Sequence, residues 1–258
     1  MFDTHCHLDD AKFDHDRPAT LQRAFLAGVT DILVPAIRPA TFDNLIHIVA
    51  STSPVRLHLA LGFHPQVVPE LSDVETLALN TLPQRLHDSR AVAVGECGLD
   101  GPTGHKELQE QLFRAQIRIA RDLSLPLIVH AFRTHEAVLR ILKEERANDV
   151  GGVIHSYSGG ATLVPRYVDL GFALSFAGSV TWPRALKPIA AAACVPDHLL
   201  LAETDAPDQS PQSLRGKRNE PASVAEVIHA LSAIRGQTLQ HLQQLTTDNA
   251  RRIFRISS

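Results

Sequence analysis

The feature that most constrains the fold is a regular alternation of short apolar runs with longer segments of helical periodicity. Eight runs rich in Val, Leu, Ile, Ala and Phe recur along the chain. Each is followed by a segment whose apolar residues repeat about every 3.6 positions. The clearest of these segments is 106–123, where Leu108, Leu112 and Ile119 fall on one face. Continuous apolar strands alternating with helices are typical of a buried parallel sheet, so we expect an α/β chain of βα units.

The expected elements divide the whole chain into eight such units. The expected strands are 2–7, 31–37, 57–61, 91–95, 125–130, 152–155, 172–177 and 199–203. The expected helices are 18–28, 42–50, 74–87, 106–123, 135–146, 163–170, 186–194, 223–234 and 238–254. Eight units in 258 residues predict a (β/α)8 TIM barrel, organised as a single domain over residues 1–258. An open doubly wound sheet is the alternative, but it often carries a glycine-rich phosphate loop after its first strand, and this sequence has none.

Charge and composition exclude other classes of protein. The formal net charge of -3 argues against a protein that coats duplex DNA, although a pocket for one nucleic-acid end stays compatible with it. Three scattered cysteines form no C-x-x-C pair, which favours a reducing compartment. No apolar run approaches the roughly 20 residues of a membrane span, and the chain starts without the apolar stretch of a signal peptide. We therefore expect a cytoplasmic protein with no membrane association and no obligate protein partner.

Residue types that bind metals lie at or just after the ends of five of the eight expected strands. They are His5, His7, Glu96, His130, His155 and Asp205. The carboxyl ends of barrel strands meet at one face, where the chemistry of this fold occurs. A lone histidine at a strand end is more often a loop-capping group than a ligand. Burying several such groups unpaired would cost several kcal/mol each, however, and a shared metal centre explains them together.

The expected ligand set indicates the kind of metal centre. Imidazoles and carboxylates suit Zn, Mn, Mg, Ni, Co or Fe better than a soft-metal site. Six candidates exceed the roughly three protein ligands of one catalytic ion. Two ions bridged by one carboxylate would use all six, and such pairs activate water and hold both attacking and leaving oxygens. We therefore predict two divalent metal ions, with the identity of the metal left open.

Six motifs, taken in order, resemble those of the TatD family of metal-dependent hydrolases. They are DTHCHLD at 3–9, GFHP at 62–65, GECGLD at 95–100, HSYSG at 155–159, ETDAP at 203–207 and RGKRNEP at 215–221. The RTH at 133–135 and the ETDAPD run are similar to the YjjV-like branch of that family. Each motif alone is modest, whereas the ordered set is highly specific and covers most of the chain.

The resemblance implies an amidohydrolase-like TIM barrel with hydrolase activity on ester bonds, and several family members are 3′–5′ DNA exonucleases. Transferred position by position, it implies that His5 and His7 bind one ion and that His130 and His155 bind the second. In the same scheme, Glu96 bridges the two ions.

The resemblance also implies roles beyond the bridged pair. Asp205 would be the ligand after strand eight that orients or deprotonates the attacking water, so Asp205 and Glu96 are the expected catalytic residues. His64 resembles the family histidine near the substrate phosphate. Arg133 is the second expected substrate contact.

The sequence departs from the family pattern at three places. The family often has an arginine two residues after the strand-five ligand, where this chain has Phe132 and places Arg133 one position later. Consecutive residues can point in different directions, so the one-residue shift can move the arginine away from the substrate phosphate. Gly101 stands where an aromatic often follows GLD, and Tyr157 stands at the usual Phe of HSYSG.

The leading hypothesis is a deoxyribonuclease, a 3′–5′ exonuclease-like phosphodiesterase acting on a DNA end. The alternative is a hydrolase of a small amide, ester or phosphoester, because the same centre can attack a carbonyl carbon. A metal-dependent binding protein is a third possibility, but no expected ligand is lost.

Several secondary residues keep two readings. Glu203 is either a partner that orients a ligand histidine or a structural acid. The basic cluster Arg215, Lys217 and Arg218 is either a solvated loop or a phosphate contact. Aromatic stacking surfaces for a base could come from Trp182, Phe132 and Tyr157.

Overall fold

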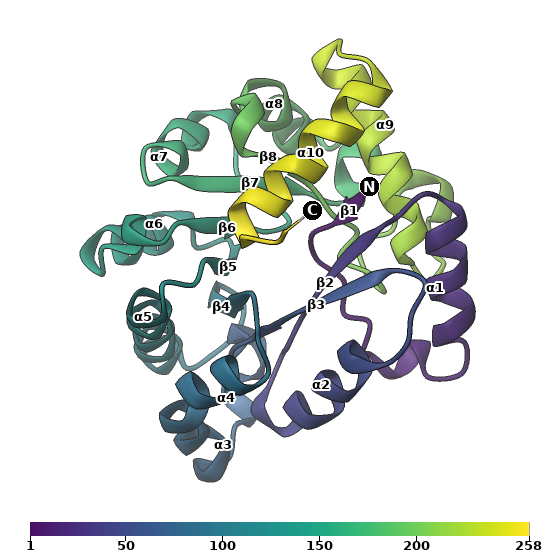
Figure 1. The fold of residues 1–258 in the computed structure, drawn as a ribbon. Coiled ribbons are helices and arrows are strands. Elements are labelled where there is room, and N and C mark those ends of the chain that lie inside the picture. Colours follow the sequence, from purple (N-terminus) through teal and green to yellow (C-terminus); the bar gives the residue numbers. More distant parts are fainter. Residues whose placement is uncertain (258) are drawn as a thin grey trace.

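The structure is a computed structural model that describes residues 1–257. Within this range, eight parallel strands pair in the order β1-β2-β3-β4-β5-β6-β7-β8, with helices around the outside (Figure 1). The strands are β1 (Phe2–Asp3), β2 (Asp31–Pro35), β3 (Arg56–Leu61), β4 (Ala93–Asp100), β5 (Leu127–Phe132), β6 (Gly152–Ile154), β7 (Phe172–Phe176) and β8 (Leu200–Ala202). The segment after β1 meets the segment after β8 through a parallel bridge between Cys6 and Ala206. The predicted TIM barrel is confirmed.

The helices follow the strands as the periodicity predicts. They are α1 (Arg17–Leu26), α2 (Phe42–Ala50), α3 (Asp73–Leu77), α4 (Leu82–Asp88), α5 (Lys106–Leu123), α6 (His135–Glu144), α7 (Val164–Val168), α8 (Leu186–Cys194), α9 (Val224–Arg235) and α10 (Leu239–Phe254). The expectation of one helix over 74–87 was wrong, because α3 and α4 are separated by a 3-10 turn. Pro83 lies in the first turn of α4 and has no N–H to donate, so a continuous helix through it would lose a hydrogen bond.

Two strands differ from their expected bounds in a way that bears on the site. β4 was expected to end at residue 95 but continues to Asp100, so Glu96 lies inside the strand. The register between β4 and β5 shifts between Val94 and Cys97, next to Glu96. β1 was expected to reach residue 7 but ends at Asp3, and the chain continues beside the barrel through the Cys6 bridge.

The two ends of the barrel are covered differently. α10 lies across the end near the chain termini (Figure 1). Its Arg251 is 3.2 Å from the Asp31 carboxylate, and its Asn249 donates to the Leu200 carbonyl at 3.0 Å. The opposite end, where the strands finish, is formed by loops that carry the expected site residues. Among the helices of the described chain, none has both the length and the apolar character that a membrane crossing needs.

Candidate metal centre

One group of ligand atoms forms where the segments after β1 and β8 meet β4. His5 Nε2 and His7 Nε2 lie 3.2 Å apart. Glu96 Oε2 is 3.0 Å from His5 Nε2 and 3.5 Å from His7 Nε2. Asp205 Oδ1 is 3.6 Å from each of these two nitrogens. Two imidazole nitrogens and two carboxylate oxygens at this spacing can bind a divalent cation.

A second group of ligand atoms faces the other oxygen of Glu96. Its Oε1 lies 2.7 Å from His155 Nε2 and 3.0 Å from His130 Nδ1. His64 Nε2 is also 2.8 Å from this oxygen, and His64, Glu96 and His130 form one cluster that could hold a metal. The structure thus brings His64 into the ligand group, and its role as a substrate contact stays a prediction.

Glu96 lies between the two groups and is fully buried. Burial alone would raise the pKa of this carboxyl, but the charges of His155, His64 and His5 and a hydrogen bond from His130 hold it well below its usual range. Its Oε2 atom is buried and accepts no hydrogen bond of adequate geometry among the described residues, although His5 Nε2 lies 3.0 Å away. A buried anionic oxygen that accepts no hydrogen bond is costly in a protein interior. The carboxylate therefore fits a role as bridge between metal ions.

Asp205 is held at the rim of the first group by the loop after β8. Its backbone is in the left-handed region, with φ of 54°, which aspartate tolerates better than most residues. Its Oδ2 accepts a hydrogen bond of 2.7 Å from Gln209 Nε2, while Oδ1 faces the histidines. Burial raises the pKa of Asp205 to about 6. This carboxylate can therefore accept a proton near neutral pH.

Asp100 supports the second group from the end of β4. Its Oδ2 lies 3.0 Å from His130 Nε2 and also accepts from Gln66 Nε2 at 3.0 Å. Burial alone would raise the pKa of Asp100, but hydrogen bonds from His130, Gln66 and Thr103 hold it well below its usual range. Because Asp100 occupies Nε2 of the ring, His130 presents Nδ1 to Glu96. Sequence reasoning did not single out Asp100 or Gln66 as functional residues, although Asp100 ends the GECGLD motif.

Glu203 and Gly98 lie beside the second group. Glu203 accepts a hydrogen bond from the Ser156 backbone N–H, and its Oε1 lies 3.6 Å from His155 Nδ1. At 3.6 Å the His155 nitrogen makes no hydrogen bond to Glu203, so a role for Glu203 in orienting this histidine stays a prediction beside that of a structural acid. A Cβ at Gly98 would lie 2.1 Å from the His130 carbonyl oxygen, so only glycine allows β4 and β5 to approach here.

The ligand atoms open into a cavity of about 410 Å³ at the carboxyl end of the barrel. Its wall is formed by the candidate ligands other than His5, together with Gln66, Phe132, Ser156, Ser179, Pro188 and Gln209. Both carboxylates and four histidines border it within reach of a small polar substrate: His7, His64, His130 and His155. The arrangement can bind and orient an anionic group beside a proton acceptor.

Family membership follows from comparison with known proteins. The sequence profile of the family described as TatD related DNase matches residues 2–255. The chain belongs to the TatD family of metal-dependent hydrolases. The resemblance drawn from the six motifs is thus confirmed.

The TatD relatives cover the full chain. The uncharacterized metal-dependent hydrolase YjjV of Escherichia coli (strain K12) is 36% identical over 258 residues, covering 99% of this chain and 98% of its own. The uncharacterized metal-dependent hydrolase YabD of Bacillus subtilis (strain 168) is 34% identical and covers 100% of both chains. The 3′-5′ ssDNA/RNA exonuclease TatD of Pectobacterium atrosepticum is 31% identical, again over 100% of both.

Solved structures agree with the TatD assignment. The crystal structure of YjjV from Escherichia coli K12 superposes with a TM-score of 0.91 at 35% identity, covering 100% of this chain and 98% of that one. A variant organophosphorus hydrolase from Deinococcus radiodurans gives a TM-score of 0.66 at 15% identity, covering 98% and 92%, and shares the fold.

The structure locates the residues at which this TatD chain departs from the family motif. Phe132 lines the metal cavity and is 39% exposed. Arg133 has φ of 57°, and its side chain lines a neighbouring cavity instead. Its guanidinium lies 5.2 Å from the centre of the Phe132 ring. The side chains of these two consecutive residues therefore line different cavities. Substrate binding by Arg133 stays a prediction.

The expected stacking and basic residues have different fates. Tyr157 is 1% exposed, and its hydroxyl donates a hydrogen bond to the Gly160 carbonyl. The expectation that Tyr157 offers a stacking surface was therefore wrong. Arg218 is engaged by Asp16 at 2.6 Å and is not available to substrate in this arrangement. Trp182 stays near the surface, with the Arg215 guanidinium 5.0 Å from its ring centre.

Proposed function

We propose that this TatD-family chain is a deoxyribonuclease that acts on a DNA end as a 3′–5′ exonuclease-like phosphodiesterase. In this proposal His5, His7, Glu96, His130, His155 and Asp205 hold two divalent metal ions, and residues 1–258 act as one domain. The observation that carries the proposal is that the two oxygens of the Glu96 carboxylate face different groups of histidines. One oxygen lies 3.0 Å from His5 Nε2, and the other lies 2.7 Å from His155 Nε2.

This arrangement suits hydrolysis of a phosphodiester. Divalent ions bound at such a centre would lower the pKa of water and neutralise phosphate charge. Asp205 Oδ2 is held by Gln209, so the carboxylate keeps a fixed direction while it takes a proton from the attacking water. His64, close to Glu96, would orient a phosphate oxygen if it is not itself a ligand.

Unpaired cations around the open end of the barrel support an anionic substrate. Within residues 1–257, the guanidinium groups of Arg90, Arg133, Arg184 and Arg215 have no hydrogen-bond or carboxylate partner by the usual distance limits. Arg90 precedes β4 and so belongs to the other end of the barrel. The other three, Arg133, Arg184 and Arg215, line cavities formed by the loops after β4, β5, β7 and β8. The chain has a net charge of -3, so free cations at this face favour a local phosphate contact over a general affinity for nucleic acid.

A direct test is to remove metal from the protein and restore Mg, Mn or Zn separately. Each form is then assayed on single-stranded DNA labelled at its 5′ end and on a panel of small esters, amides and phosphoesters. We expect a metal-dependent ladder of products that shortens from the 3′ end. Hydrolysis of a small ester or amide without DNA cleavage would replace the proposal with the alternative function.

Two variants separate the enzyme from a contaminating nuclease. Asp205→Asn keeps the volume of the side chain and is expected to lower the rate by roughly 10²- to 10⁴-fold, the usual range for loss of a general base. Asp122→Asn is the matched control, because Asp122 is an exposed residue of α5. DNA cleavage that survives in Asp205→Asn at the wild-type rate would contradict the proposal.

A further inference from the structure

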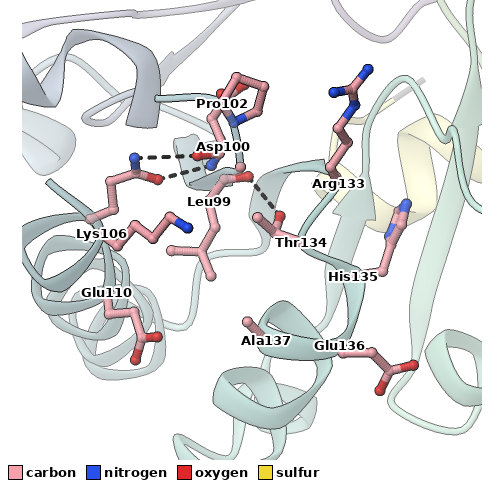
Figure 2. Close-up of a pocket in the computed structure, with 12 residues that line it drawn as sticks. Leu99, Asp100, Pro102, Lys106, Glu110, Arg133, Thr134, His135, Glu136 and Ala137 are labelled. Carbon is pink, nitrogen blue, oxygen red and sulfur yellow. Dashed lines mark hydrogen bonds between the residues drawn. The ribbon is translucent and has the colours of Figure 1, made fainter. Parts of the chain in front are cut away.

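A second and larger cavity lies beside the metal cavity, between the beginnings of α5 and α6 (Figure 2). Its volume is about 720 Å³. One wall comes from the end of β4 and the following loop, with Leu99, Asp100 and Pro102. The other walls come from the first turns of α5 and α6, with Lys106, Gln109 and Glu110 on one side and residues 133–137 on the other.

Two cations that line this cavity have no acidic partner. Within the described residues, neither the Lys106 ammonium nor the Arg133 guanidinium has a carboxylate oxygen within 4.0 Å. The three acidic residues of the wall already have partners: Asp100 lies 3.0 Å from His130 Nε2, Glu110 lies 3.1 Å from Arg140, and Glu136 lies 2.6 Å from Arg166. Figure 2 shows the Lys106 side chain extending from the start of α5 toward Leu99. Two unpaired cations in a concave site favour an anionic ligand.

Part of the remaining wall is apolar. Leu99, Pro102 and Ala137 line the cavity there (Figure 2). A ligand that satisfies both kinds of surface has an anionic group and a less polar body. A nucleotide has both, with its phosphate as the anion and its sugar and base as the body. A volume of about 720 Å³ is within the usual range of small-molecule sites.

The second cavity shares a wall with the metal cavity. Asp100 borders the second cavity, and its Oδ2 lies 3.0 Å from His130 Nε2 in the metal centre. Phe132 borders the metal cavity, and the next residue, Arg133, borders the second one. The Phe132 ring is partly exposed at this boundary, 5.2 Å from the Arg133 guanidinium. A strand leaving the metal centre over Phe132 would therefore reach Arg133 next, at the edge of the cavity that Lys106 also lines.

We propose that this second cavity binds a nucleotide, with its phosphate between Lys106 and Arg133 and its sugar and base against Leu99, Pro102 and Ala137. Phe132 supplies a stacking surface where the strand passes from one cavity to the other. The phosphate belongs either to the nucleotide that adjoins the cleaved one in a strand or to a released mononucleotide. The strand assignment rests on the proposed nuclease function, whereas binding of a mononucleotide does not.

The first experiment measures binding without catalysis. Metal-free protein is titrated with thymidine 5′-monophosphate, thymidine and inorganic phosphate in a calorimeter. We expect the nucleotide to bind more tightly than either fragment, and Lys106→Met and Arg133→Met each to weaken it at least ten-fold. Lys143→Met is the matched control, because Lys143 is an exposed lysine of α6 and lies outside this cavity. Equal affinity in all four proteins, or no nucleotide binding to wild-type protein, would overturn the proposal.

The second experiment identifies the source of the phosphate and separates this site from the proposed function. The metal-loaded enzyme is assayed on single strands of increasing length. If the site holds a strand nucleotide, KM for the longer strands rises about ten-fold in Lys106→Met and stays at the wild-type value in Lys143→Met. Unchanged KM with weakened mononucleotide binding assigns the site to the released product. If wild-type enzyme cleaves no DNA but Lys106-dependent nucleotide binding persists, the nuclease function fails and the nucleotide site stands.

Discussion

The Asp100 carboxylate contacts Nε2 of the His130 ring, with Oδ2 at 3.0 Å. The other ring nitrogen, Nδ1, faces Glu96 at 3.0 Å. The carboxylate therefore decides which nitrogen His130 offers to a metal. A hydrogen bond of this kind fixes the tautomer and direction of a ligand histidine and makes it a stronger donor.

The first prediction concerns Asp100→Asn. The amide keeps the size of the side chain but removes the negative charge behind His130, so affinity for metal at the His130 group is expected to fall roughly 10- to 100-fold. Competition of each protein with a coloured chelator measures the affinity. Asp122→Asn, an exposed substitution on α5, is expected to match wild type. Equal affinities in Asp100→Asn and wild type would show that Asp100 does not act through His130.

The second prediction concerns Glu96→Gln and the number of bound ions. A glutamine offers one oxygen and no negative charge, so it cannot serve both the His5 side and the His155 side of the centre. Elemental analysis after dialysis is expected to give fewer metal equivalents per chain than wild type, which should approach two. Glu107→Gln, an exposed change in the first turn of α5, serves as the control. A variant that retains the full wild-type content would argue against a bridging Glu96.

The third prediction concerns metal removal. Ions that bind the folded chain but not the unfolded chain stabilise it by about 2.7 kcal/mol when their concentration is 100 times Kd. For a chain of this size, that corresponds to a rise in Tm of roughly 5–10 °C. Thermal melts of stripped and metal-loaded protein measure the shift. An Asp205→Asn protein should show a smaller shift, and identical melts with and without metal in the wild type would contradict binding at this centre.

The barrel could be predicted from the sequence because both faces of its parallel strands are buried. β2 and β7 are buried at every position, and apart from Asp31 at the start of β2 and Ser175 in β7 they consist of apolar residues. The positions of His130 and His155 could be predicted for the same reason, since each follows a run of apolar residues. The motif resemblance then assigned these residues to a family that the comparison confirmed.

Contacts that depend on three-dimensional register could not be predicted. Asp100 reaches His130 because β4 continues past its apolar part and pairs with β5, so that Gly98 lies opposite His130. Gln209 reaches Asp205 from an irregular loop that has no periodic pattern. Arg133 turns away from the metal cavity because its backbone is left-handed, with φ of 57°, and nothing in the letters RTH specifies this.

The opposite end of the barrel gives the fourth prediction. Asp31 is 0% exposed in its side chain, and its oxygens lie 2.9 Å from Arg56 Nε, 2.9 Å from His58 Nε2 and 3.2 Å from an Arg251 nitrogen. Arg251 belongs to α10, so this carboxylate ties the last helix to β2 and β3. Asp31→Asn leaves Arg56 and Arg251 without their anion and is expected to destabilise the protein by about 3 kcal/mol at pH 7.

The loss of stability in Asp31→Asn should depend on pH in a defined direction. Burial alone would raise the pKa of Asp31, but hydrogen bonds from His58, Thr30, Arg56 and Arg251 hold it well below its usual range. A carboxyl with a lowered folded-state pKa stabilises the fold fully above its unfolded pKa of about 3.9, and this contribution is lost as pH falls toward the folded value. Urea unfolding at pH 7 and at pH 3 should therefore show a smaller difference between wild type and Asp31→Asn at the lower pH. Asp43→Asn, whose side chain is 88% exposed, should differ little from wild type at either pH. A constant difference for Asp31→Asn at both values would mean that the carboxylate charge is not what holds α10 to the barrel.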